Sequence, residues 1–153
     1  MSPTSKWAAW RALPAAHRLL LLQALVMLPL MALGLRVLGV RRMLAFAESK
    51  ASRGRPPADA RAVVSVTARL VAAAARHGPY CASCLPMALA LKRLLGQRGV
   101  ATDLRIGVAP ARGELDAHAW LEYRGQPLID GPDVRGRFHS FDEALTSESP
   151  VAR

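Results

Sequence analysis

The stretch CASCLPMALALKRLL, residues 81–95, decides the fold, because it places a cysteine at the start of a strongly apolar helix. Ser83 suits the N-cap of a helix that begins near Cys84, and Pro86 falls in its first turn, where a missing N–H costs little. Gly99 fits the C′ position that ends such a helix. Five leucines give the helix a broad apolar face: Leu85, Leu89, Leu91, Leu94 and Leu95.

Beyond this helix the pattern changes to that of strands. Residues 101–108 alternate apolar and polar side chains, which predicts a strand with one apolar face. Residues 109–116 are expected to form a loop. Residues 117–122 and 126–130 predict two short strands around a glycine turn.

Another helix is expected before the cysteine. Pro57 and Asp59 open it, because proline and an acidic side chain are both favoured near a helix start. Apolar residues then recur at helical spacing until Gly78 and Pro79 stop the helix. Helices followed by an antiparallel sheet indicate the α+β class.

The segment SKASRGRPP, residues 49–57, is the clearest linker, because it is polar and closed by two prolines. It divides the chain into an N-terminal apolar helical region, residues 1–50, and a domain at residues 57–145 that holds every candidate for chemistry. Within that domain, Phe138 and Phe141 are candidate anchors for the last segment.

The N-terminal region contains the uncharged run LLLLQALVMLPLMALGL, residues 19–35, interrupted by Pro29 and Gly34. Three interpretations stay open: a buried helix or helical hairpin of the core, a helix at a membrane surface, and a membrane span. The shortness of the run and its interruptions favour the first. Residues 1–18 do not resemble a cleavable signal peptide, so we expect a cytoplasmic protein that either is fully soluble or makes peripheral membrane contact through residues 19–35.

The composition indicates a folded protein with one core, since 52% of the residues are hydrophobic and 21% are charged. The net charge of +10 favours acidic partners such as nucleic acid, anionic lipid or an acidic peptide. The basic residues are scattered, however, and no aromatic side chains are interleaved with them. We therefore expect no nucleic-acid partner.

Cys84 is the candidate nucleophile. The dipole and free N–H groups of a helix N-terminus favour a thiolate, which is the reactive form. A simpler alternative is a small apolar side chain on an alanine- and leucine-rich helix. Cys81 and Cys84 also form a C-x-x-C pair, but a redox motif should follow a strand, and zinc needs two more suitably spaced ligands. We expect no metal and no cofactor.

His118 is the candidate general base, and Asp130 the residue that orients it. If residues 123–125 form a three-residue turn with glycine in the left-handed position, Glu122 faces Gln126 and His118 faces Asp130. Residues directly opposite share a face at about 5 Å, so the carboxylate would hold the imidazole. A two-residue turn would place them on opposite faces. Nucleophile, base and orienting carboxylate are the parts of a catalytic triad.

Simpler interpretations of these two residues also stay open. His118 is also compatible with a structural role, as a histidine whose hydrogen bonds are satisfied in the core. Asp130 is compatible with a turn residue ahead of Gly131 and Pro132, in which case Asp133 would orient the histidine.

The same residues carry a family resemblance. The run CLPMALALKRLLGQRGVATDLRIGVAP, residues 84–110, followed by DAHAWLEYRGQPLID, residues 116–130, resembles the leader peptidases of lasso-peptide biosynthesis. The likeness extends over residues 57–141. It implies a transglutaminase-like, papain-like cysteine-protease core in which a helix carrying the cysteine packs on a small antiparallel sheet carrying the histidine and aspartate.

The resemblance implies a cysteine protease that removes the leader from a ribosomally made precursor, so that a separate asparagine-synthetase-like cyclase can close the macrolactam. In that family pattern Cys84 is the nucleophile, His118 the general base and acid, and Asp130 the orienting residue. We also expect Trp120 to contact substrate. The implied partners are the precursor, a small leader-recognition protein and the cyclase. A non-catalytic or membrane-recruiting scaffold and a transglutaminase-type amide transfer are the competing functions.

Overall fold

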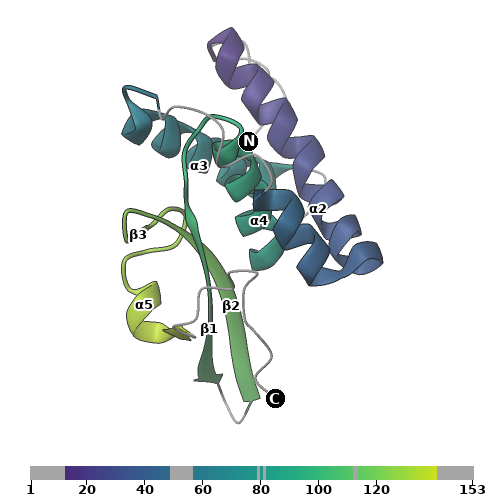
Figure 1. Ribbon diagram of the computed structural model, residues 1–153, viewed down its shortest axis with the longest axis vertical. Helices are drawn as coiled ribbons and strands as arrows, with labels where there is room; N and C mark the ends of the chain where they lie inside the picture. Colours follow the sequence, from purple (N-terminus) through teal and green to yellow (C-terminus); the bar gives the residue numbers. More distant parts are fainter. Residues whose placement is uncertain (1–12, 49–56, 79, 81, 112–113, 141–153) are drawn as a thin grey trace, which may run out of the picture.

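The structure is a computed structural model that describes residues 13–48, 57–78, 80, 82–111 and 114–140 (Figure 1). Within these residues it has the expected α+β architecture of long helices followed by a small antiparallel sheet. The cysteine-bearing helix α4 (Cys84–Gly96) contacts the sheet as well as the long helices α2 (Ala15–Glu48) and α3 (Ala60–His77).

Helix α4 is almost entirely enclosed. Ala88 and every residue after it in α4 are buried, and Leu89, Leu91, Leu94 and Leu95 are fully so. The helix begins at Cys84 as predicted, and Gly99 (φ 74°) occupies the predicted C′ position. Two bonds there form a Schellman motif: the Val100 N–H donates to the Leu95 carbonyl and the Gly99 N–H to the Gly96 carbonyl.

Helix α3 begins and ends where the sequence predicted. The side chain of Asp59 accepts a hydrogen bond from the Ala62 N–H at 3.1 Å, which caps the first turn. The Gly78 N–H donates to the Ala74 carbonyl at the other end. The buried side of α3, which includes Val71 and Ala74, packs against α2 and α4.

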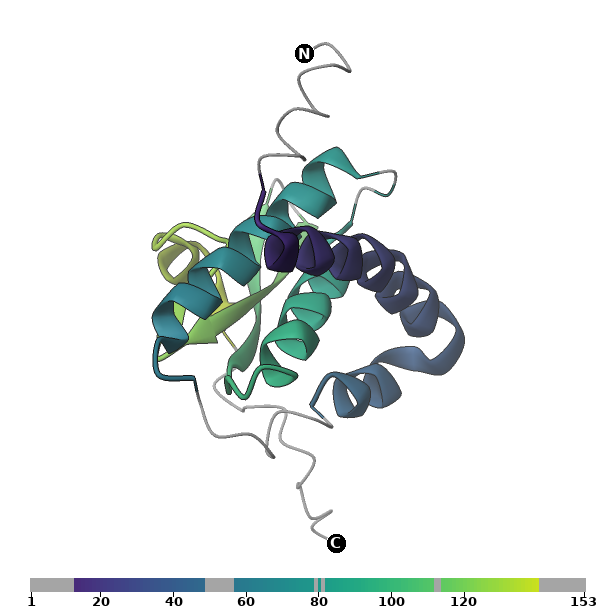
Figure 2. The same cartoon turned by 90° about the horizontal axis from the view of Figure 1, so that it is seen from above.

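Helix α2 is a helical hairpin, one of the forms expected for the apolar run. Gly39 (φ 77°, ψ 169°) interrupts the helix, and Figure 2 shows the chain doubling back there. A Cβ at Gly34 would overlap the side chain of Met43, so the two arms are in close contact. Four side chains on one face of the first arm are buried: Leu20, Ala24, Leu28 and Met31.

These side chains belong to the same hydrophobic core as those of α3 and α4. The two regions distinguished in the sequence, residues 1–50 and 57–145, therefore share one core in the part of the chain that the structure describes. The linker between them and Phe141 lie outside the described residues.

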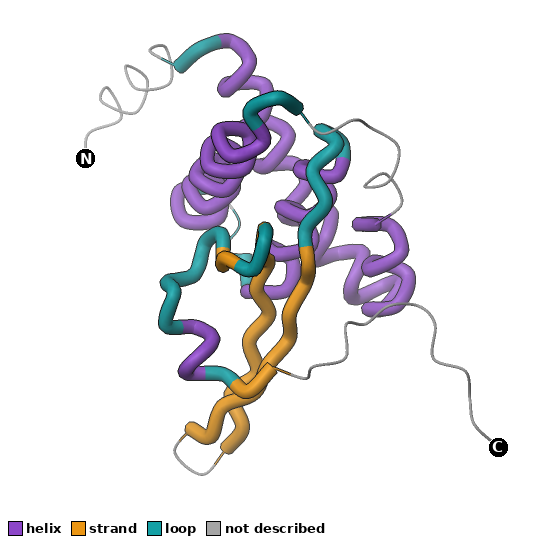
Figure 3. The backbone as a smooth tube through the Cα atoms, turned by 60° about the vertical axis from the view of Figure 1, so that its left-hand side comes forward, coloured by secondary structure: helices purple, strands orange, loops and turns teal. Residues whose placement is uncertain are grey.

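The described strands form one sheet in the order β3-β2-β1-β4, antiparallel throughout. Its centre is a long hairpin of β1 (Asp103–Ala111) and β2 (Glu114–Tyr123), whose far end extends beyond the long helices (Figures 1 and 3). The short strands β3 (Gln126–Pro127) and β4 (His139–Ser140) lie at the edges.

Two strand predictions were wrong. Most of the expected loop at 109–116 belongs to the paired strands β1 and β2. The two strands remain hydrogen-bonded beyond the part whose side chains alternate between core and solvent, and this outer part includes the exposed Leu115. The expected strand at 126–130 pairs only over Gln126 and Pro127, and a single further bond runs from the Leu128 N–H to the Leu121 carbonyl.

Candidate active site

Cys84 is the first residue of α4 and is a half-buried free cysteine. Ser83 occupies the N-cap position as expected, but its hydroxyl makes no capping hydrogen bond. An N-cap side chain accepts from the second or third helical N–H, and Pro86 has none, so the Leu85 N–H is the group that lacks this cap. The free N–H groups of a helix start are normally satisfied by a side chain, water or a ligand.

His118 and Asp130 are in direct contact. His118 lies on β2, and Asp130 lies three residues beyond the end of β3. Nε2 of His118 is 2.7 Å from Oδ1 of Asp130, and both side chains are 22% exposed. A carboxylate only accepts, so the Nε2–H donates and Nδ1 carries the lone pair that can take a proton.

This contact forms in a different register from the predicted one. The turn has two residues, Arg124 (φ 51°) and Gly125 (φ 75°), and Tyr123 pairs with Gln126. Both turn residues take the left-handed conformation of a type I′ hairpin, which a non-glycine residue rarely adopts. The predicted three-residue turn assigned that conformation to glycine alone and was wrong.

Asp130 still reaches His118 because the chain leaves the ladder before it. Leu128 makes the last ladder bond to β2, and residues 128–130 form a bend rather than a strand. Strand alternation therefore no longer fixes the side on which Asp130 projects. The contact was predicted correctly, but for a reason that the structure does not support.

Cys84 shares a small cavity with Asp130 of this pair. The cavity has a volume of about 10 Å³. His118 does not line it, and among the described residues no hydrogen bond joins the Cys84 thiol to His118. Thus the structure brings His118 and Asp130 together and places the third candidate, Cys84, beside Asp130.

Strand alternation explains this arrangement. On β2, Ala119 and Leu121 project to the side that α4 covers. His118 and Trp120 alternate with them and pack against Phe138, although Trp120 also lines the small cavity. This packing also involves α5 (Val134–Arg137), which Phe138 follows. Asp130, beyond the edge strand, borders both environments.

The imidazole of His118 is packed between rings. Its centroid is 5.0 Å from that of Phe138 at an interplanar angle of 29°, and 6.1 Å from that of Trp120 at 15°. Trp120 is only 1% exposed and forms a second small core with Val134 and Phe138. The indole therefore packs as part of the core, and the expected contact of Trp120 with substrate stays a prediction.

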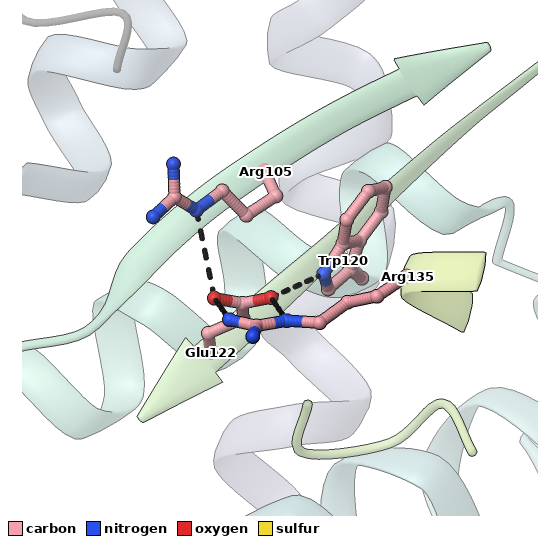
Figure 4. Close-up of polar contacts among 4 residues, drawn as sticks. All are labelled: Arg105, Trp120, Glu122 and Arg135. Carbon is pink, nitrogen blue, oxygen red and sulfur yellow. Dashed lines mark hydrogen bonds and ion pairs between the residues drawn. The ribbon is translucent and has the colours of Figure 1, made fainter. Parts of the chain in front are cut away.

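A buried carboxylate, Glu122, secures this packing (Figure 4). Its side chain is 2% exposed and accepts from Trp120 Nε1 at 2.9 Å. Arg135 of α5 contacts it in a bidentate manner, through Nε at 2.8 Å and Nη2 at 2.6 Å. Arg105 of β1 adds an ion pair at 3.5 Å. Glu122 thus ties α5 and Trp120 to the sheet.

The charges of this cluster support one another. Hydrogen bonding from Arg135, together with Trp120 and Arg105, holds the pKa of Glu122 below its ordinary value, although burial acts in the opposite direction. The hydrogen bond and charge of Glu122 raise the pKa of Arg135 in return. Glu122 is therefore ionised at neutral pH.

The sequence analysis missed this cluster. The alternation His118-x-Trp120-x-Glu122 already places the three side chains on one face of β2, which was the available signal. Nothing in the local pattern marks Arg135, because it comes from a four-residue helix that was not predicted.

The described residues contain no group of three histidine, cysteine, aspartate or glutamate side chains placed to hold a metal ion. Cys81 lies outside those residues, so the geometry of the C-x-x-C pair is not described.

Residues 24–141 match the family described as the transglutaminase-like superfamily. The chain belongs to the transglutaminase-like superfamily. This fold is typical of cysteine-protease-like enzymes, so the α+β class and the superfamily level of the resemblance are confirmed. The match begins inside α2, which places most of that hairpin within the transglutaminase-like region. Neither a curated protein nor a solved structure matches the chain.

Proposed function

We propose that this transglutaminase-like protein is a cysteine peptidase that removes the leader from a ribosomally synthesised lasso-peptide precursor. The observation that supports it best is the 2.7 Å contact between His118 and Asp130, beside a cavity that Cys84 also lines. A paired imidazole next to a helix-terminal cysteine is the arrangement of a thiol protease. The finer assignment to precursor processing rests on the resemblance of residues 84–110 and 116–130.

In the proposed reaction, Nδ1 of His118 takes the proton of the Cys84 thiol. The thiolate attacks the carbonyl carbon of the leader–core peptide bond. As the C–N bond breaks, His118 protonates the departing amine of the core and a thioester to the leader remains. Water, deprotonated by His118, then attacks the thioester, which releases the leader acid and restores the thiol. Asp130 holds the imidazole with Nδ1 directed to the reaction.

The N-terminus of α4 supplies the site for the oxyanion. The N–H of Cys84 belongs to the first turn, which lacks a side-chain cap. Such N–H groups stabilise negative charge that develops on the carbonyl oxygen. The reaction also requires the thiol to approach His118, and catalytic hydrogen bonds commonly tighten only when substrate binds.

The proposal includes partners. The leader peptidases that this chain resembles act with a small leader-recognition protein. They deliver the freed core to an asparagine-synthetase-like cyclase, which closes the macrolactam. We propose the same partners here, with the precursor as substrate and the cytoplasm as the site of action.

Peripheral membrane contact is favoured by α2, the one described helix that is long and apolar enough to cross a membrane. Its buried face is part of the core, so contact through the opposite face fits better than a span. Nine large apolar side chains of α2 are more than a third exposed: Leu19, Leu22, Val26, Leu30, Leu33, Val37, Leu38, Val40 and Phe46. So extensive an exposed apolar surface usually marks an interaction site.

Sedimentation with vesicles of phosphatidylcholine and phosphatidylglycerol tests this contact. The variant Val26→Ser/Leu33→Ser should reduce the bound fraction several-fold, since both residues are exposed and outside the core. Equal binding by the variant and the wild type would argue against α2 as the membrane-contacting element.

The peptidase proposal is tested by incubating a precursor encoded beside the gene with this protein and the small leader-binding protein. Mass spectrometry should show a leader acid and a core with a free N-terminal amine. A product in which the leader acyl group is joined to an added amine would indicate transglutaminase-type transfer instead.

A non-catalytic scaffold is the second candidate, supported by the exposed apolar face of α2 and by the separation of Cys84 from His118. Iodoacetamide distinguishes the two. A peptidase thiol should be alkylated well below pH 8, whereas an inert structural cysteine should not.

A further inference from the structure

A groove with a volume of about 840 Å³ lies between α3 and the β2–β3 turn, on the described part of the chain. Four arginines line it: Arg61, Arg69 and Arg76 from α3 and Arg124 from the turn. We infer that this basic groove binds an extended, acidic segment of the peptide substrate. The inference rests on the proposed function, which makes the substrate a peptide, and adds the class of sequence recognised.

The α3 arginines form a single stripe. Five residues of α3 that line the groove follow one another at steps of four, four, three and four positions: Arg61, Ser65, Arg69, Ala72 and Arg76. Such steps keep all five on one face of a helix. At 1.5 Å per residue the stripe is about 22 Å long, the span of roughly seven residues of extended peptide.

The arginines of the groove lack anionic partners. Among the described residues, none of the four makes an ion pair and no carboxylate lines the groove. The arginines on the other side of the sheet contrast with them: Arg105 and Arg135 pair with Glu122, and Arg137 pairs with Asp133. The groove therefore carries four uncompensated positive charges, which a ligand with carboxylates would neutralise.

The groove adjoins the candidate active site. Ile129 lines the groove and also the small cavity that contains Cys84 and Asp130. The neighbouring strand β3 is an edge of the sheet, where an extended chain can lie alongside. A peptide held in the groove would thus lie close to the cavity that Cys84 lines.

The lining favours a peptide over nucleic acid. The floor contains aliphatic side chains, among them the buried Val64 and half-buried Leu128, which suit the apolar residues of a peptide. Tyr123 is the one aromatic side chain among the lining residues that the structure describes, and the guanidinium of Arg124 already lies 5.3 Å from its ring centroid. Single-stranded nucleic acid usually needs several open rings on which bases stack.

The spacing of the arginines predicts the spacing of acidic residues in the bound peptide. Arg61 and Arg69 are about 12 Å apart along the helix axis, and Arg69 and Arg76 about 10 Å apart. Extended peptide covers these distances in three to four residues. The best ligand therefore carries acidic residues every three or four positions with apolar residues between them.

Fluorescence anisotropy tests the inference, with the Cys84→Ala protein so that the probe is not cut. The probes are a fluorescein-labelled ten-residue peptide with glutamate at every third or fourth position, its glutamine and lysine analogues, and a single-stranded RNA octamer. We expect the glutamate peptide to bind at least tenfold more tightly than either analogue. In the variant Arg61→Gln/Arg69→Gln/Arg76→Gln this binding should weaken at least tenfold.

A matched control removes three exposed arginines from α2, outside the groove. The variant Arg36→Gln/Arg41→Gln/Arg42→Gln makes the same change in net charge and should weaken binding less than twofold. The variant Arg61→Lys/Arg69→Lys/Arg76→Lys keeps the charge and should retain binding within about threefold. Equal weakening by the α2 control would overturn the inference, as would preferential, arginine-dependent binding of the RNA.

Thiol reactivity separates this inference from the proposed function. If the wild-type thiol were inert but the glutamate peptide bound in an arginine-dependent manner, the peptidase function would be rejected and the peptide-binding role of the groove retained. If the thiol were reactive but all three peptides bound equally weakly, the peptidase function would be retained and the peptide-binding role of the groove rejected.

Discussion

Asp130 accepts a hydrogen bond from His118 although the two residues do not face each other in the β2–β3 ladder. Pairing ends at Leu128, and the bend that follows carries the carboxylate to the ring. The contact between Asp130 and His118 therefore depends on the point at which β3 ends, and not on the alternation of side chains along that strand.

Replacing Asp130 by Asn should impair catalysis much more than folding. Asparagine keeps the size of the side chain but no longer fixes the imidazole tautomer or stabilises its protonated form. We expect kcat/KM to fall on the order of 10²–10⁴-fold, with a thermal unfolding midpoint close to that of the wild type.

Asp133→Asn is the matched control. Its carboxylate pairs with Arg137 at 3.6 Å, and both side chains are about two-thirds exposed. Such a pair contributes little, so activity should stay within about twofold of wild type. Loss of activity in this variant instead would assign the orienting role to Asp133.

Cys84→Ala should abolish cleavage of a precursor in the presence of its leader-binding partner, because no other described residue supplies a thiol. Product formation is measured by mass spectrometry. Cys81→Ala should retain cleavage. If Cys81→Ala were the inactive variant, the assignment of the nucleophile would be wrong.

Glu122→Gln should destabilise the fold. The amide retains an acceptor for the Trp120 N–H but loses the charge that Arg135 and Arg105 contact. We expect the free energy of unfolding to fall by about 1.5–3 kcal/mol at pH 7, measured by urea denaturation.

The pH dependence of stability provides a second readout for Glu122. Its pKa is lowered in the folded protein, so between that value and its ordinary value of 4.5 the unfolded chain binds more protons. The stabilisation is therefore complete above about pH 5 and is lost as the pH falls through the folded pKa. Glu122→Gln should show a shallower loss of stability over this acidic range. Parallel curves for variant and wild type would contradict this role.

Gly39→Ala should destabilise the α2 hairpin through the backbone alone. A Cβ at Gly39 would meet nothing within 4 Å, yet φ 77° with ψ 169° is a conformation essentially restricted to glycine. We expect a loss of about 1–3 kcal/mol in the free energy of unfolding. Gly136→Ala is the control, since a Cβ there also has open space but φ is ordinary. It should change stability by less than about 0.5 kcal/mol.

Much of the helical half could be predicted because its signals are local. Asp59, Gly78 and Gly99 each act within one turn of a helix end, and the leucines of α4 repeat at helical spacing. The strand limits could not be predicted in this way. Pairing beyond residue 108 needs no apolar alternation, and the left-handed conformation of Arg124 is not encoded by its residue type.

In the candidate site, too, some features could be predicted from the sequence and others depend on tertiary packing. His118 and Asp130 were identified as a pair from residue types, order and spacing, and the contact exists. The separation of Cys84 from the ring and the burial of Trp120 depend on tertiary packing between α4, α5 and the two faces of the sheet. Arg135, which completes the Glu122 cluster, is distant from it in sequence and belongs to a helix too short to leave a periodic signal.

The enclosure of α4 limits which of its residues can contact a substrate. From Ala88 onward the helix has no solvent-facing side, so its only accessible part is the first turn, where Cys84 lies half-buried. A substitution from Ala88 onward can therefore alter a reaction only indirectly, through packing, whereas one in the first turn can meet a bound substrate directly.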